Sequence, residues 1–460
     1  MVYAISIVAL IAIFTVATLT PINMGILAFA GAFVIGGWVS GIPVEDIIDA
    51  FPGSTFIIVG GITLLFAIAK TNGTIDLVIE ASLRLVRGRR WAILWMMFLL
   101  SGLLMALGSV LAVGMLAPIA MPLAAKNRIN PFLMGMVISH GALACAFSPI
   151  NLYGAFINGL MDSTGVGANP LVLFALPFVL NLAIAIVLFL IYGLDLIGRR
   201  TPRPAGVADT GDASDGGGFG GSSRRSSGGV APGSGPSGNT AMLTDREVIE
   251  EALSHEGMKP VKMDRYRFAT LAGIGFLVVG SVLFGIDVGV SSICISAVLL
   301  LMAPKSHPKV VDNVAWPAVV LVCGMLTYMA VMTQNGTLDF LGDAASALGS
   351  PLLTALILCY AVAIISAFGS SIGTLGIALP LAAPMLAMGE VGAVGFVAAL
   401  AFSATVVDVS PFSTNGVMVL ANAQVEDKAR FQRKMLAYCG LIVLSAPMFV
   451  WALVVVPTSV

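Results

Sequence analysis

The chain has 460 residues, of which 58% are hydrophobic and 10% are charged, with a formal net charge of −1 at pH 7. A soluble domain carries about 25% charged residues, so this composition excludes an ordinary soluble globular protein. Apolar runs of about 20 residues without strand-like alternation predict helices that cross a membrane. The lipid bilayer is therefore the expected surrounding, and the near-zero net charge gives no reason to expect a nucleic-acid partner.

The first half of the chain, residues 1–198, is predicted to form three spans, a hairpin and two further spans. The first apolar run has no basic residues before it and no small-residue cleavage site after it, so it is interpreted as a retained span rather than a signal peptide. Residues 73–90 are predicted to form an amphipathic helix along the cytoplasmic face. The predicted spans are 2–19, 22–39, 54–70, the broken helix 131–161 and 169–198, and the hairpin is 91–125.

A different composition separates the two apolar halves. Residues 199–267 form the expected cytoplasmic linker, because 201–239 is rich in Gly, Ser and Pro and predicts disorder. A capping-box pattern from Thr244 to Glu247 predicts one short helix there. The second half, 268–460, repeats the first. Its predicted spans are 268–284, 287–302, 314–333, the broken helix 393–421 and 436–456, and its hairpin is 351–388.

Short motifs recur between the halves in a nearly constant register. Asn-Gly-Thr occurs at Asn72 and again at Asn335, which is 263 residues later. Ser-Pro occurs at Ser148 and at Ser410, which is 262 residues later. Generic small-residue bias in membrane helices would not readily give several such matches in register. The sequence therefore predicts an internal repeat.

Charge placement predicts that the two repeats are inverted. The hairpin 91–125 has basic residues on both flanks, which should both be cytoplasmic, so this run should enter the membrane and turn back. A pair of short full crossings is the alternative, although about 35 residues is little for two spans. The flanks of the hairpin 351–388 carry no basic residue and should lie outside. Equivalent elements would then face opposite sides of the membrane.

The Ser-Pro motifs lie inside apolar runs, in the sequences FSPINLYG at 147–154 and VSPFSTNG at 409–416. Pro149 cannot donate to the Cys145 carbonyl and disfavours helix at Ser148. Non-helical backbone at membrane depth is tolerated only where it is buried or lines a watery cavity. The two breaks therefore predict a cavity near the membrane midplane, where carriers with inverted repeats bind substrate and coupling ion. The hairpin tips, at 108–110 and 369–374, should form its other wall.

The candidate site combines hydroxyl, amide and backbone groups, with no arginine or lysine in the tips or breaks. An anion bound there would depend on neutral donors and on co-bound cations. The candidate substrate-binding residues are Ser109, Asn151, Ser371, Thr374, Thr414 and Asn415. The candidate cation-binding residues are Gly108, Ser148, Asn151, Ser370, Gly373, Asp408, Ser410 and Ser413.

Two ionisable residues lie in these apolar segments. Asp408 would ligate a cation or carry a proton, and the alternative is a structural carboxylate that caps the broken helix. For His140 we expect a hydrogen-bonded packing role rather than proton transfer. The five cysteines form no CxxC and the chain has no HExxH motif, so no metal enzyme and no cofactor beyond a coupling ion are expected. The GxSxG pattern at 369–373 lies in a hairpin rather than in a strand-turn-helix, so a serine hydrolase is not expected either.

A hairpin with a serine-rich tip, a proline beyond it (Pro118 and Pro380) and a broken helix about 40 residues further on resembles the divalent anion/sodium symporters of the ion transporter superfamily. Within this superfamily the first half is most similar to bacterial malonate/dicarboxylate carriers. The sodium symporters carry Ser-Asn-Thr at each tip, whereas these tips read Gly108-Ser109-Val110 and Ser370-Ser371-Ile372. The resemblance implies a homodimer in the bacterial inner membrane, in which residues 91–161 and 351–421 move as an elevator.

The resulting expectation is secondary active transport of small carboxylates, either malonate or C4-dicarboxylates, by cation-coupled symport. Sodium is expected over protons because the breaks offer mostly neutral oxygen ligands. The alternatives are another anion, either an inorganic oxyanion or a monocarboxylate, with proton coupling, or an ion channel. A channel should show a continuous polar stripe along several spans, whereas polarity here concentrates at two tips and two breaks.

Overall fold

The computed structural model describes most of the chain outside the predicted linker. The described residues are 1–20, 22–85, 89–109, 111–163, 169–198, 263–304, 309–338, 340–341, 350–368, 371–387 and 391–459. All regular elements within these ranges are helices. The predicted helix at Thr244 and most of the linker lie outside the described residues.

The described part of the first half contains eleven α-helices and one π-helical segment. They are α1 (Val2–Leu19), α2 (Met24–Gly31) continued by the π-helical η1 (Ala32–Val39), α3 (Val44–Asp49), α4 (Gly53–Thr71), α5 (Thr74–Leu85), α6 (Arg90–Ala106), α7 (Ala112–Lys126), α8 (Pro131–Ala144), α9 (Leu152–Ser163), α10 (Pro170–Tyr192) and α11 (Asp195–Gly198). The second half repeats this order from its first span onward. Its elements are α13 (Arg265–Phe284), α14 (Val288–Met302), η2 (Val310–Asn313), α15 (Trp316–Gln334), α17 (Pro351–Phe368), α18 (Ser371–Ala387), α19 (Ala393–Val406), α20 (Thr414–Asn422), α21 (Lys428–Val450), η3 (Trp451–Val455) and α22 (Val456–Thr458).

Many of these helices are apolar enough for a membrane. Within the described residues, five are also long enough to cross one, and eight further apolar helices are shorter. Large apolar side chains stay exposed on the outer helices, for example Leu283 and Leu444, both 71% exposed. Such a surface is stable against lipid but not against water. The all-helical, apolar architecture is that of a multi-pass membrane protein.

Each predicted broken helix is two helices with a non-helical connection. In the first half α8 ends at Ala144 and α9 begins at Leu152, so the break contains Ser148. In the second half α19 ends at Val406 and α20 begins at Thr414. Proline contributes to both breaks, because Pro149 and Pro411 have no N–H to continue the helical hydrogen bonds. It is not sufficient alone, since Pro118 and Pro177 lie inside continuous helices.

The two predicted hairpins are helix-turn-helix units, α6 with α7 and α17 with α18, and the helices of each pair contact one another. The Arg90 guanidinium donates to the carbonyl oxygens of Asn127 and Arg128, which ties the two feet of the first hairpin together. In the second hairpin α18 already begins at Ser371. Ser371, Gly373 and Thr374 therefore lie at the start of α18, and the expectation that the tip at 369–374 forms a wall of the cavity stays a prediction.

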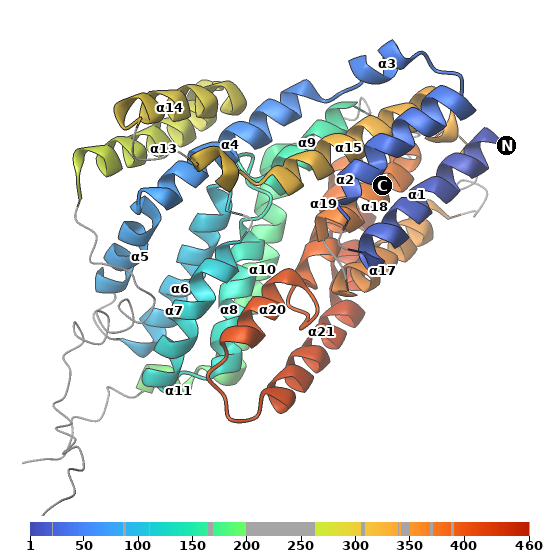
Figure 1. Cartoon of the computed structure of the whole chain (residues 1–460). Coiled ribbons are helices and arrows are strands. Elements are labelled where there is room, and N and C mark those ends of the chain that lie inside the picture. Colours follow the sequence, from blue (N-terminus) through green and yellow to red (C-terminus); the bar gives the residue numbers. More distant parts are fainter. Residues whose placement is uncertain are drawn as a thin grey trace, which may run out of the picture.

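The two halves interlock through equivalent helix pairs. Helix α4 packs along α14, and α15 packs along α2. Figure 1 shows the first pair on one side of the bundle beside α13, and the second pair on the other side beside α1. Glycines allow both close approaches. A Cβ on Gly61 would lie 2.3 Å from the Ser292 Oγ, and a Cβ on Gly324 would lie 2.1 Å from the Gly25 carbonyl oxygen.

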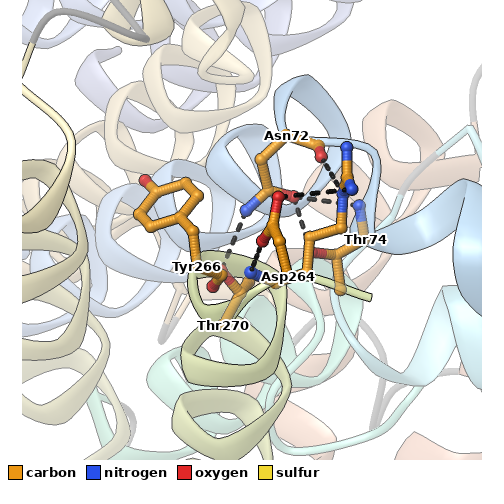
Figure 2. Close-up of polar contacts among 6 residues, drawn as sticks. Asn72, Thr74, Asp264, Tyr266 and Thr270 are labelled. Atoms are coloured by element: carbon orange, nitrogen blue, oxygen red, sulfur yellow. Dashed lines mark hydrogen bonds and ion pairs between the residues drawn. The ribbon is translucent and has the colours of Figure 1, made fainter. Parts of the chain in front are cut away.

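The Asn-Gly-Thr motifs form the same corner after α4 and after α15. At the first corner the Asn72 Oδ1 accepts hydrogen bonds from the Thr74 backbone N–H (2.9 Å) and hydroxyl (2.6 Å), and Gly73 has a φ of 76°. The Asn72 amide donates across the halves to the Thr270 hydroxyl of α13 at 2.8 Å (Figure 2). Arg267 closes the corner by donating to the Asn72 carbonyl at 2.8 Å.

Equivalent contacts also cross between the broken helices and the hairpins. Helix α20 packs against α7, where the Met418 side chain would meet a Cβ on Gly114 at 3.5 Å. Phe156 of α9 approaches Gly376 of α18 in the equivalent position, with 3.8 Å to the corresponding Cβ. The helix after each break, α9 or α20, therefore packs on the second helix of the hairpin in the opposite repeat, α18 or α7.

Candidate functional site

The first break is tied to the end of α6. Asn151 is completely buried and caps α9, because its Oδ1 accepts from the Tyr153 N–H at 3.0 Å. Its amide donates to the Met105 carbonyl at 2.5 Å, at the start of the first hairpin tip. Gly108, with a φ of 102°, brings the tip against the break, since an added Cβ would lie 3.5 Å from the Ile150 carbonyl oxygen. The tip and the break thus form one packed unit.

Within this unit the two predicted serines have local partners. The Ser148 hydroxyl accepts from the Ile150 N–H at 3.4 Å, and its carbonyl accepts from the Asn151 N–H at 2.8 Å. The Ser109 hydroxyl lies 3.5 Å from the Met115 sulfur, a weak acceptor. In these contacts both hydroxyls form only weak or long hydrogen bonds, so exchanging these bonds for bonds to a ligand would cost little free energy.

The second break has the same backbone turns as the first. The Ser410 hydroxyl accepts from the Phe412 N–H at 3.2 Å, and its carbonyl accepts from the Ser413 N–H at 3.0 Å. A glycine follows each break because the chain folds back closely. A Cβ on Gly154 would lie 2.2 Å from the Ser148 carbonyl oxygen, and a Cβ on Gly416 would lie 1.8 Å from the Ser410 carbonyl oxygen.

Asp408 lies in the second break, and its buried carboxylate is close to the N-terminus of α20. Its Oδ2 accepts from the Asn415 amide at 3.0 Å, and its carboxylate also interacts with the Ser413 hydroxyl and with the backbone N–H groups of Thr414 and Asn415. A carboxylate at these N–H groups compensates the positive end of the helix. The N-cap residue of α20 is Ser413, and Asp408 lies beside this cap with neutral partners among the described residues. Its role as cation ligand, proton carrier or structural carboxylate stays a prediction.

Tyr153 joins the two halves of the candidate site. It lies in the first turn of α9, its hydroxyl forms a hydrogen bond with Ser371, and it is close enough to Asp408 to interact electrostatically. Ser371 in turn contacts the Ser366 hydroxyl at 3.1 Å, which donates to the Ala404 carbonyl at 2.6 Å. This chain of contacts runs from the first broken helix through the second hairpin to α19. Sequence reasoning missed Tyr153, although the 262-residue register pairs it with Asn415.

The candidate residues fall into two groups that Tyr153 connects. The first group is Gly108, Ser109, Ser148 and Asn151, and the second is Ser371, Asp408, Ser410, Ser413 and Asn415. Gly373 and Thr374 lie further along α18, the Thr414 side chain is exposed, and Ser370 lies outside the described residues. The expectation that the two tips form one wall of a cavity near the membrane midplane stays a prediction.

A basic side chain stands beside the first tip, although none occurs in the tip itself. A cavity of about 110 Å³ is lined by Gly108, Ser109, Thr63, Lys70 and Asn313, among others. Lys70 is the last but one residue of α4 and is exposed. The sequence analysis assumed a site without a basic residue, whereas Lys70, which also interacts electrostatically with Asp76, lines this cavity together with Ser109.

His140 has the packing role that the sequence analysis favoured. It is completely buried on α8, its Nδ1 lies 2.8 Å from the Asn181 Oδ1, and its Nε2 lies 2.6 Å from the Tyr438 hydroxyl. Both ring nitrogens are therefore hydrogen-bonded, to α10 and to α21.

The breaks, hairpins and apolar helices are features of a multi-pass membrane protein of the carrier type. Residues 1–146 match the family model described as the N-terminus of dicarboxylate carrier protein MatC, and residues 276–458 match the family model described as citrate transporter. Both families contain carriers of the ion transporter superfamily type, and the resemblance that the sequence indicated is thereby confirmed. No curated protein is a significant match to the chain.

Proposed function

We propose that this protein is a secondary active transporter that moves small carboxylates together with a cation. The observation that carries the proposal is the pairing of interrupted helices with hairpin ends, where unwound backbone, hydroxyls and amides gather inside an apolar bundle. The family models that match the two halves are named for dicarboxylate and citrate carriers, which favours a carboxylate over an inorganic oxyanion.

The substrate carboxylate binds beside the first tip and break. The Ser109 hydroxyl and the Lys70 ammonium group border one cavity there, and together they offer a hydrogen bond and a positive charge. A second carboxylate would extend toward Tyr153 and Ser371, which connect this region to the second half. A substrate with a carboxylate at each end would contact both groups of residues, so this arrangement favours dicarboxylates over monocarboxylates.

The coupling cation binds at the second break. Ser410, Ser413 and Asn415 contribute neutral oxygens, and Asp408 contributes the negative charge. Sodium suits such oxygens and the unwound carbonyls, so sodium is the proposed coupling ion. A cation there would also offset the cost of a buried carboxylate whose described partners are neutral.

The proposed transport cycle is an elevator. The hairpins and broken helices move together, because Asn151 ties α9 to α6, while the helices that interlock through Gly61 and Gly324 stay as a scaffold in a homodimer. The proposed location is a bacterial inner membrane.

Uptake by proteoliposomes tests this function. Purified protein is reconstituted, and accumulation of radiolabelled malonate, succinate and citrate is measured under an imposed inward sodium gradient at constant pH. Saturable accumulation against the substrate gradient is expected for at least one dicarboxylate. Uptake driven only by an inward proton gradient would favour proton coupling at Asp408, and conductance without saturation would favour a channel and overturn the proposal.

A further inference from the structure

A groove runs along the outer surface of the bundle between α10 and α21. Both helices pack on α19 rather than on one another, so the α19 side chain of Phe402 forms the floor. The groove has a volume of about 410 Å³, and its walls include Ile184 and Ile191 of α10 and Leu441 and Phe449 of α21. A gap of this kind between two helices that face lipid is open to a membrane component.

The few polar groups in the groove already have partners. The Tyr438 hydroxyl is bonded to His140, and the Ser445 hydroxyl donates to the Leu441 carbonyl of its own helix at 2.7 Å. The groove is therefore suited to a hydrocarbon chain rather than to a polar solute. Its lining on α10 extends from Leu180 to Tyr192, which is about 18 Å of helix. One leaflet of a membrane's hydrocarbon core measures about 15 Å.

A basic side chain stands at one end of the groove. The Lys434 ammonium group lies 4.2 Å from the centroid of the Tyr192 ring, which also lines the groove, and 4.3 Å from that of the Phe132 ring. Two aromatic faces hold the cation at this position. Lysine and aromatic residues at the end of an apolar groove mark the depth of lipid headgroups.

A second cavity continues from Lys434 away from the groove. It has a volume of about 570 Å³ and is lined by Lys434, Arg430, Asp427 and Glu426, among others. Among the charged residues that line this cavity, the order away from the groove is therefore Lys434, Arg430, Asp427 and Glu426. Arg433 and Lys428 lie on the same helix but do not line the cavity. Lys434 and Arg430 are one helical turn apart, and Asp427 lies about 4.5 Å further along the axis.

We propose that this groove binds a phosphatidylethanolamine molecule. One acyl chain lies between α10 and α21, the phosphate binds Lys434 and Arg430, and the primary ammonium group donates hydrogen bonds to the carboxylates of Glu426 and Asp427. The order of charges matches the order of groups in this lipid. An anionic phospholipid would satisfy only the two cations, and a choline headgroup has no N–H to donate to the carboxylates.

Native mass spectrometry of the full-length protein tests the proposal. The protein is reconstituted with equal amounts of phosphatidylethanolamine, phosphatidylglycerol and phosphatidylcholine of identical acyl chains, and the lipids that stay bound after gentle detergent exchange are counted. Wild-type protein should retain phosphatidylethanolamine at least threefold over each of the others. Equal retention of the three lipids, or a preference for phosphatidylglycerol, would overturn the assignment.

Variants separate the headgroup from the chain. Lys434→Ala should lower bound phospholipid at least fivefold, and Ala183→Trp, at an exposed groove position, should do so by filling the groove. The double change Glu426→Gln and Asp427→Asn should keep lipid bound but remove the preference for phosphatidylethanolamine, while the asparagine preserves the cap of α21. Arg433→Ala, on the same helix but outside both cavities, is the matched control and should change nothing.

A second copy of the chain is the rival occupant of the groove. If Ala183→Trp abolishes a dimer in the same spectra while the bound lipid is unchanged, the groove is a protein interface and the lipid site is excluded. Unchanged lipid in both Lys434→Ala and Ala183→Trp would also exclude it.

Discussion

The side-chain amides of Asn72 and Asn335 make matched hydrogen bonds across the two halves of the protein. Asn72 donates to Thr270 of α13 at 2.8 Å, and Asn335 donates to the Ser6 hydroxyl of α1 at 3.1 Å. The corner after α4 is thus bonded to α13, the first helix of the second half, and the corner after α15 is bonded to α1, the first helix of the first half. Figure 2 shows the first of these corners.

Removal of either amide should weaken the attachment between the two halves of the protein and lower the stability of the fold. Asn72→Ala leaves the buried Thr270 hydroxyl and the Thr74 N–H without this partner, which destabilises the protein by about 1–3 kcal/mol. Asn335→Ala should have a similar effect. The measurement is thermal unfolding in detergent, and Asn422→Ala, whose amide bonds only within α20, is the control. Equal melting temperatures for Asn72→Ala and the control would contradict the structural role.

The contact between Tyr153 and Ser371 links the first broken helix to the second hairpin. Tyr153→Phe keeps the ring packed at 5.8 Å from Phe147 and removes only the hydroxyl. Loss of one hydrogen bond of about 1 kcal/mol predicts uptake about fivefold slower, with little change in stability. Tyr360→Phe, which removes a hydroxyl bonded to the Leu444 carbonyl outside the candidate site, should leave uptake unchanged. If both variants transport like wild type, Tyr153 has no part in coupling the halves.

The breaks and the repeat were predictable because both leave local marks in the sequence. Proline removes a backbone donor and disfavours the helix before it, so Ser148-Pro149 and Ser410-Pro411 located both interruptions. Proline alone is not sufficient, because Pro118, Pro177 and Pro447 lie inside helices that continue. The Asn-Gly-Thr motifs were recognised as equivalent, and the structure gives them the same turn. Their hydrogen bonds to the opposite half could not be predicted, because Thr270 lies 198 residues from Asn72.

The parts of the site that were missed depend on packing between distant segments. Lys70 lines the same cavity as the first tip only because α4 passes Gly108, where an added Cβ would meet the Ile62 side chain at 2.5 Å, and the position of Lys70 near the end of an apolar helix gave no sign of this. Tyr153 resembles any aromatic residue of a membrane helix until its hydroxyl is seen beside Ser371. The sequence did not indicate that part of the second tip, predicted at 369–374, is helical, although α18 begins at Ser371.

Lys70 should contribute to affinity for charged substrate. Lys70→Gln removes the ammonium group beside Ser109 and should raise the KM for a dicarboxylate about two- to fivefold, which is the range of an exposed ion pair. The effect should shrink as salt is raised, because salt screens exposed charges. Lys70→Arg should retain most of the affinity. Lys126→Gln, at the foot of the same hairpin, is the control, and an identical KM for all these variants would exclude an anion at this cavity.

The first hairpin should be reached from one side of the membrane only. Helices α6 and α7 have 17 and 15 residues, so each is about 22–26 Å long and shorter than the 30 Å hydrocarbon core. Their feet are tied by Arg90. Single cysteines at Arg89 and Asn127, in a background without the five native cysteines, should react with impermeant maleimide only from the cytoplasm. Reaction of either one from outside would end the re-entrant interpretation and the inverted repeat with it.

The last prediction concerns the coupling ion and Asp408. Asp408→Asn keeps an oxygen that can accept from the N–H groups of α20, so the cap and the fold should survive, while the negative charge is lost.

If sodium binds at the second break, this variant should need several-fold more sodium for half-maximal uptake, with an unchanged response to an imposed proton gradient. Ser410→Ala removes a neutral ligand beside the same carboxylate and should shift the sodium dependence in the same direction but less, because the charge remains. The matched control is Asp287→Asn, which changes an exposed capping carboxylate at the start of α14 and should leave the sodium dependence as in wild type. Uptake that ignores sodium, follows an inward proton gradient and disappears in Asp408→Asn would assign Asp408 as the proton carrier instead, since an amide can cap a helix but cannot take up and release a proton.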